Sequence, residues 1–340
     1  MRPSSPAAAA LPLSRRRFGT WLAASAATAG AGQAALWAGN ARAADAPLSS
    51  KLRIVIPANE GGGWDQTGRA LGAALLASGA VGTVTYENIG GKGGTIGLAR
   101  YVEKYDADPD AVLMSGMVMV GAVALQKPAV DMSRIAPLAR LTSDYEMVVV
   151  KSDSPIVTAK DLIAKMRADP ANAAIAGGSA GGVDHMFAGI LSRAAGNTSA
   201  LVYQPFPGGA QVVSAVESGK AVAGISGYSE FSEHIASGKL RAIGVSSKNP
   251  FMGVPSVRQQ GVDADLANWR GVFTGKAVPV QRQAVLLDAV RRAVATDAWQ
   301  KALKRSNWDS YWMEGKDFQG FLELDQSMAG ILTYILKLKS

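Results

Sequence analysis

A strand that runs into a glycine loop and then into a helix is the feature that most limits the fold of this chain. Residues 54–56 are three β-branched residues, Pro57 ends the run, and Gly61, Gly62 and Gly63 precede an apolar segment with helical spacing. The same order recurs around 83–101 and again from residue 174 onward, with glycines at 90–94 and 177–182. The sequence therefore predicts three loops of one kind.

Such a loop is suited to holding an anion. Glycines let the backbone approach a ligand closely, and the first N–H groups of a helix lack partners inside the helix. The helix dipole also favours negative charge at that end. One such loop is equally consistent with an ordinary turn that needs positive φ. Three of them favour a carboxylate or phosphate site.

The remainder of the chain alternates short apolar strands with amphipathic helices. This alternation predicts an α/β fold with largely parallel sheets. Thr158 and Asp161 predict a capping box at the start of one helix, and the polar segment 151–155 indicates the entry to a second lobe. Expected strands lie at 83–87, 112–115, 145–150, 174–176, 201–203, 221–226, 240–246 and 269–273. Expected helices lie at 65–78, 96–101, 117–125, 158–168, from 183, and at 210–217, 228–237, 280–296, 297–306 and 316–337.

The first 43 residues have the pattern of an export signal. Residues 14–18 read Ser-Arg-Arg-Arg-Phe, a weakly apolar run follows, and Ala41-Arg42-Ala43 is an A-x-A cleavage site. We expect twin-arginine export and a periplasmic mature protein that begins near Ala44. Five arginines and no acid lie before that point, so the formal charge falls from +8 to +3. The remaining bases are scattered, which gives no indication of nucleic-acid binding.

Composition excludes several kinds of chemistry. The chain has no cysteine, so it has no disulfide, thiolate metal site or cysteine nucleophile. Only His185 and His234 could serve as imidazole ligands or bases, which argues against a His-based metal site. Residues 63–70 lack the Lys-Ser/Thr of a phosphate loop, and none of the three glycine loops has the dinucleotide-binding spacing.

One enzymatic alternative stays open at this point. Residues 177–181 match the G-x-S-x-G nucleophile elbow between a strand and a helix, with Ser179 as the nucleophile. The base would be His234, or His185 by folding back. This secreted serine hydrolase is the less favoured hypothesis, because His234 falls in an amphipathic helix and glycine-rich pentapeptides match by chance.

The motifs in their order along the chain resemble one family. Residues 57–65 with Arg69 resemble the first binding loop of the tripartite tricarboxylate transporter substrate-binding proteins, the Bug-type periplasmic receptors. Residues 88–97 look like the second loop, and 177–185 resemble the helix start in the second lobe. Segments 203–210 and 269–273 are similar in place and kind. The sequence departs from the family at Lys92, where a small residue is more usual, and at Asn59-Glu60, which replaces paired prolines of many members.

The resemblance implies a two-lobed periplasmic-binding-protein (Venus flytrap) fold, in which each lobe is a mainly parallel sheet flanked by helices and the chain crosses twice. We expect lobe 1 at 44–150 and 269–340 and lobe 2 at 151–268. The implied function is capture of a small di- or tricarboxylate and delivery to a tripartite tricarboxylate-type membrane permease. No enzymatic activity, cofactor, metal or nucleic acid is expected, and family members act as monomers.

The candidate ligand-binding residues come from the three loops and the segments after them. Asp65 and Asp184 are expected to hold the loops through backbone N–H groups, because a bare carboxylate would repel a carboxylate ligand. Lys92 is either a partner for a second carboxylate or a solvated loop lysine, and Trp64 either stacks on an aromatic acid or closes a lid. The full set is Gly62, Gly63, Trp64, Asp65, Lys92, Gly93, Gly94, Thr95, Ser115, Ser179, Gly181, Gly182, Asp184, Tyr203 and Phe206.

Overall fold

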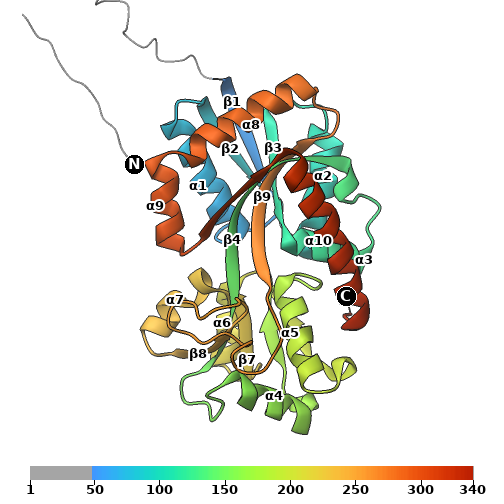
Figure 1. Cartoon of the computed structure of the whole chain (residues 1–340), viewed down its shortest axis with the longest axis vertical. Coiled ribbons are helices and arrows are strands. Elements are labelled where there is room, and N and C mark those ends of the chain that lie inside the picture. Colours follow the sequence, from blue (N-terminus) through green and yellow to red (C-terminus); the bar gives the residue numbers. More distant parts are fainter. Residues whose placement is uncertain (1–47, 340) are drawn as a thin grey trace, which may run out of the picture. The chain divides into compact units, whose positions relative to one another are not determined.

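A computed structural model describes residues 48–339 of the chain. The predicted signal segment, 1–43, lies outside these residues. The described part is one compact unit in which helices cover hydrogen-bonded strands (Figure 1). None of its helices combines the length and apolar character that crossing a bilayer requires.

Two long strands connect two groups of elements. β4 (Ile135–Lys151) pairs with β9 (Ala267–Gly275) in antiparallel fashion from Ile135 to Tyr145, and then continues from Glu146 to pair with β7 and β8. Figure 1 shows β4 and β9 running side by side between the two groups. The chain thus crosses twice between the groups, as expected for the predicted fold.

The first group surrounds the N-terminal strands. β1 pairs in parallel with β2 and β3, whereas β3 pairs with β9 and β10 with β4 in antiparallel fashion. Its elements are β1 (Ser49–Ile56), α1 (Gly63–Ala77), β2 (Val81–Asn88), α2 (Thr95–Tyr105), β3 (Ala111–Gly116), α3 (Met117–Gln126), α8 (Val280–Val294), α9 (Asp297–Ser306), β10 (Asp309–Glu314) and α10 (Gly315–Ile335).

The second group contains the segment between the two crossings. β5 pairs in parallel with β6 and β7, and β7 and β8 pair with β4 in antiparallel fashion. Its elements are α4 (Ala159–Ala168), β5 (Ile175–Gly177), α5 (Val183–Ala194), β6 (Tyr203–Pro205), α6 (Gly209–Glu217), β7 (Ala223–Gly227), α7 (Tyr228–Ala236) and β8 (Leu240–Val245). The predicted lobe boundaries at 150/151 and 268/269 stay a prediction.

The fold is the α/β arrangement that the sequence predicted, but the strand pairing is mixed and not mainly parallel. The pairs of β1 with β2 and β3 and of β5 with β6 and β7 are parallel, whereas all pairs of β4 and β9 are antiparallel because these two strands cross between the groups. Other differences concern single elements. β10 and the first half of β4 were not predicted, and β6 begins two residues later than expected. The capping box is confirmed: Asp161 N donates to Thr158 Oγ1 (3.1 Å), and Thr158 N donates to Asp161 Oδ2 (2.9 Å).

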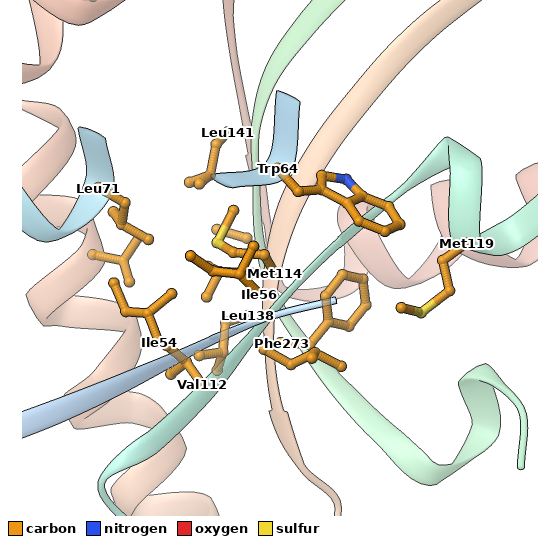
Figure 2. Close-up of a cluster of buried hydrophobic side chains, with 14 of the residues drawn as sticks. Ile54, Ile56, Trp64, Leu71, Val112, Met114, Met119, Leu138, Leu141 and Phe273 are labelled. Carbon is orange, nitrogen blue, oxygen red and sulfur yellow. The ribbon is translucent and has the colours of Figure 1, made fainter. Parts of the chain in front are cut away.

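Apolar side chains from β1, β3, β4 and β9 form the core that supports the first glycine loop. Figure 2 shows the side chains of Ile54, Ile56, Met114 and Leu138 in this cluster, with Trp64 beside them. Trp64 is 6% exposed, so most of its indole belongs to the core. The predicted alternatives of stacking or lid closure therefore concern only the small edge that borders solvent.

Candidate functional site

A cavity of about 780 Å³ lies where the glycine loops of both groups meet. Its wall includes the loops after β1, β2 and β5, the starts of α6 and α7, and two residues of β9. A Cβ built on Gly93 would lie 3.5 Å from Cβ of Ser179, so the second and third loops approach each other directly. The volume is within the usual range for small-molecule sites, roughly 300–1,000 Å³.

Five helices begin at this cavity, and the N-cap of each is a glycine. The caps of α1, α2, α5, α6 and α7 all line the cavity, and none forms a side-chain cap hydrogen bond. They are Gly62, Gly94, Gly182, Gly208 and Gly227. Of the other helices, α4 and α9 have threonine caps that accept from the backbone, whereas α3, α8 and α10 also lack a side-chain cap hydrogen bond. The helix starts at the cavity therefore lack side-chain caps, which makes them suited to binding an anion.

The last position of the second loop, residue 94, requires glycine. Gly94 has φ +90°, and a Cβ there would lie 2.7 Å from the Trp64 ring and 2.9 Å from Met119 Cε. Trp64 therefore supports this loop from the core side. Lys92 has φ +50° and is exposed in the cavity wall, and its ammonium has no partner among the described residues.

The two aspartates hold their loops, as expected. Gly61 N donates to Asp65 Oδ2 (2.9 Å), and Gly178 N donates to Asp184 Oδ2 (2.5 Å). Burial alone would raise the pKa of Asp65, but hydrogen bonds from Arg69, Gly61 and Asn88 lower it overall. Asp184 has no comparable cation beside it, and burial raises its pKa.

The predicted site residues divide into two sets. Ten lie in the cavity wall, and their contact with a ligand stays a prediction: Gly62, Gly63, Trp64, Lys92, Gly93, Gly94, Ser179, Gly182, Asp184 and Phe206. The structure places five others behind the wall: Asp65, Thr95, Ser115, Gly181 and Tyr203.

Some of this second set support the wall from behind. Tyr203 Oη donates to Gly178 O (2.7 Å), and Thr95 Oγ1 donates to Lys92 O (3.0 Å). Both contacts fix a glycine loop. Ser115 is fully buried and donates to Met119 Sδ (3.3 Å), and Gly181 has φ +83° against Gly121 of α3. We therefore expect these residues to shape the loops.

Sequence reasoning missed the polar and charged residues on β7, α7 and β9. Arg270 and Asn268 of β9, Ser226 of β7 and Glu230 of α7 all line the cavity. Arg270 is 4% exposed, its Nη2 donates to Asp144 Oδ2 (3.1 Å), and its Nη1 donates to Thr67 Oγ1 (3.2 Å). A Cβ on Gly63 would lie 2.6 Å from Arg270 Nη2, so this glycine makes room for the guanidinium.

The geometry gives Ser179 no general base. His185 accepts from Gly181 N at Nδ1 (3.1 Å) and stacks on Tyr203 with ring centroids 4.1 Å apart. Burial lowers the pKa of His185 to about 4. His234 lies 3.5 Å from Glu217 on α6, and no histidine among residues 48–339 hydrogen-bonds Ser179. Within the same residues, no group of three or more His, Asp or Glu side chains could hold a metal ion.

Comparisons with known proteins identify the family. The model of the tripartite tricarboxylate transporter family receptor matches residues 73–333. Protein BugT of Bordetella pertussis is 27% identical over 242 residues, which cover 68% of this chain and 73% of BugT.

Two solved structures of Rhodopseudomonas palustris proteins share the fold. MatC, with bound malate, is 19% identical and has a TM-score of 0.72; the match covers 84% of this chain and 99% of the MatC chain. Rpa4515, with adipate, is 18% identical and has a TM-score of 0.77; the match covers 87% of this chain and 99% of the Rpa4515 chain. Members of this family are solute-binding receptors, so the hydrolase alternative is wrong on both geometry and family. The chain belongs to the tripartite tricarboxylate transporter receptor family and is a non-enzymatic solute-binding protein.

Proposed function

We propose that this receptor captures a small di- or tricarboxylate in the cavity and delivers it to a membrane permease of the tripartite tricarboxylate type. The observation that carries the proposal is the ring of five helix starts with glycine caps around one cavity. A ligand carboxylate supplies the acceptors that these helices lack. Charge-assisted hydrogen bonds of this kind contribute roughly 1.5–3 kcal/mol each.

Further support comes from the loops of both groups that meet in the cavity wall. Ser179 and Gly93 lie side by side there, so one ligand could contact both groups of elements. Lys92 adds a cation on the same wall as Gly93. The related receptors that hold malate and adipate have this fold. Export by the twin-arginine signal, cleavage near Ala43, a periplasmic location and a monomeric state belong to the same proposal.

A ligand panel tests this function. Purified mature protein is titrated with mono-, di- and tricarboxylates and melted at each concentration. A ligand at a hundred times its Kd should stabilise the fold by about 2.7 kcal/mol. Ser179→Ala should weaken the binding of the acid that stabilises most by roughly 0.5–1.5 kcal/mol in calorimetry. If no carboxylate in the panel raises the melting temperature, the proposal is wrong.

Lys92 separates two versions of the site. If its ammonium pairs with a second carboxylate, Lys92→Ala should weaken a tricarboxylate more than a monocarboxylate. The loss should shrink at high salt, because screening weakens exposed pairs. If the substitution changes the affinity for both ligand classes equally at every salt concentration, Lys92 is a solvated loop lysine.

A further inference from the structure

The residues after α10 reach from the first group of elements to the second. Figure 1 shows α10 beside α3 and extending to the level of α5. Leu336 and Leu338, which follow the helix, are 1% and 9% exposed. Both lie against α5, because a Cβ built on Gly189 would lie 3.0 Å from Leu336 Cδ1 and 2.9 Å from Leu338 Cδ2. We call residues 336–339 the clasp.

The sequence of α5 makes room for the clasp. Gly189 lies in the interior of this helix, where glycine is less favourable than alanine because it loses more backbone freedom on folding. The side chains of Leu336 and Leu338 fill the place that a Cβ would take. A residue that weakens the helix therefore stands at the position that the two leucines cover.

A defined turn brings the second leucine back against α5. Lys337 has φ +51°, which is uncommon for lysine. Lys337 N donates to Tyr334 O (3.1 Å) and Leu338 N donates to Thr333 O (3.1 Å), which is the hydrogen-bond pattern of a Schellman motif. Lys337 and Lys339 stay exposed while Leu338 is buried. The burial of Leu338 offsets the unfavourable backbone conformation of Lys337.

α3 holds α5 at a second place. A Cβ on Gly121 of α3 would overlap Gly181 O and Met186 Cε, so α3 packs directly on the start of α5. Met186 belongs to the same buried apolar cluster as Leu336, Leu338 and the core of the first group. Two elements of the first group, α3 and the clasp, thus hold one helix of the second group.

This helix also positions the third glycine loop. Ser179 lies in the loop just before α5, and Gly93 of the second loop lies beside it. Gly189 follows the Gly182 cap by seven residues, which is about 10 Å along a helix. A helix moves as a rigid element, so a movement of α5 that separates Ser179 from Gly93 also shifts α5 against the clasp. Such a shift exposes apolar side chains to water, which is unfavourable.

We propose that the clasp is a latch: the contact of Leu336 and Leu338 with Gly189 holds the two groups in the arrangement in which the second and third loops meet. Release of the latch lets the groups move apart about β4 and β9 while each group stays folded. Only the effect on affinity rests on the proposed function. The apparent Kd for a carboxylate that contacts both loops should rise as the fraction of receptor with the loops together falls.

Distances between the groups test the latch without a ligand. The chain has no cysteine, so Lys160→Cys in α4 and Lys301→Cys in α9 supply one spin-label site in each group. Double electron–electron resonance then gives the distance distribution of the ligand-free protein. Leu338→Ala should enlarge a second distance population about threefold or more over the wild type. Leu324→Ala, at a leucine of the same helix that is 71% exposed, is the control and should match the wild type. Identical distributions for Leu338→Ala and the wild type would overturn the proposal.

A variant of α5 releases the clasp from the other side. Gly189→Leu leaves the sequence of the clasp unchanged but fills the place of its two leucines, so it should enlarge the same second population. A latch leaves both groups folded when it is released. If neither Leu338→Ala nor Gly189→Leu folds, the contact belongs to the folding core and the latch is refuted.

Calorimetry with malate, adipate and citrate measures the effect on binding. Each of these acids that the wild type binds should bind Leu338→Ala about fivefold more weakly or worse, and Leu324→Ala within about twofold of the wild type. Saturation with that acid should also remove the second distance population. Equal affinities in Leu338→Ala and the wild type would contradict the latch. If the wild type binds neither these nor any other carboxylate, the proposed function fails, whereas the ligand-free distances still decide the latch.

Discussion

The ion pair between Arg270 and Asp144 joins the two crossing strands at the cavity wall, which Arg270 lines. Asp144 is 0% exposed, and Arg270 is its only ion-pair partner among the described residues. Without Arg270, the Asp144 carboxylate would be buried with no compensating charge. Removing one member of a buried pair typically costs about 3–5 kcal/mol, since the other charge stays buried. We therefore expect Arg270→Met to lower the free energy of unfolding by that amount at pH 7.5.

The loss should depend on pH in a defined direction. Burial already raises the pKa of Asp144, and Arg270 is the largest influence that opposes this rise. Without Arg270 the folded-state pKa rises further above the unfolded value. A raised folded-state pKa gives stability below the unfolded pKa that is lost as pH rises through the folded pKa. The variant should therefore recover part of its stability on acidification toward pH 5.

Urea unfolding of a double-mutant cycle measures both effects. The cycle comprises the wild type, Arg270→Met, Asp144→Asn and the double variant, each at pH 5 and pH 7.5. The double variant should be more stable than Arg270→Met at pH 7.5, because neither charge of the pair is left buried without its partner. A loss below about 1 kcal/mol for Arg270→Met, or a double variant no better than the single, would refute the reasoning.

Three further predictions concern stability. Gly94→Ala should lower the free energy of unfolding by about 1–3 kcal/mol or more, because a Cβ would meet Trp64. Gly79→Ala, at φ +68° in open space, is the control and should lower it only by the backbone strain of about 1–2 kcal/mol. Urea midpoints compare the two variants. Thr158→Ala should lower the free energy of unfolding by about 0.5–2 kcal/mol, and an unchanged midpoint would contradict the capping box. The empty receptor should lose stability as pH rises from about 4.5 to about 7, because the folded-state pKa of Glu230 is raised to about 7. Glu230→Gln should make the melting temperature depend less on pH over this range. A curve as steep as that of the wild type would contradict the prediction.

The sequence predicted elements whose signals are local. Strand, glycine loop and helix start recur at three places, and the structure has all three. The first half of β4 was not predicted, since Pro137 argues against a central strand. The structure places Pro137 at a register shift, where a missing N–H is tolerated. β10 is an exposed strand at the sheet's edge with little apolar alternation, so its sequence carries no clear strand signal.

The polar residues at the cavity outside the glycine loops could not be predicted, because they come from distant segments. Asp184, Glu230 and Asn268 lie on three different elements. One local signal existed: Asp144 and Glu146 alternate within an otherwise apolar strand, which places both on one face. Two acids on a buried face call for partners, and Arg270 was the nearest candidate in the matching strand. The glycine caps of the three predicted loops, by contrast, could each be predicted from the local sequence of a single loop.

A crystal structure of the receptor with its tightest acid tests the central claim most directly. The carboxylate should lie within hydrogen-bond distance of backbone N–H groups at the starts of α2 or α5, beside Gly94 or Ser179. A ligand whose carboxylate lies instead against Asp184 and Glu230, with the glycine-capped helices bound only to water, would contradict this assignment of the cavity.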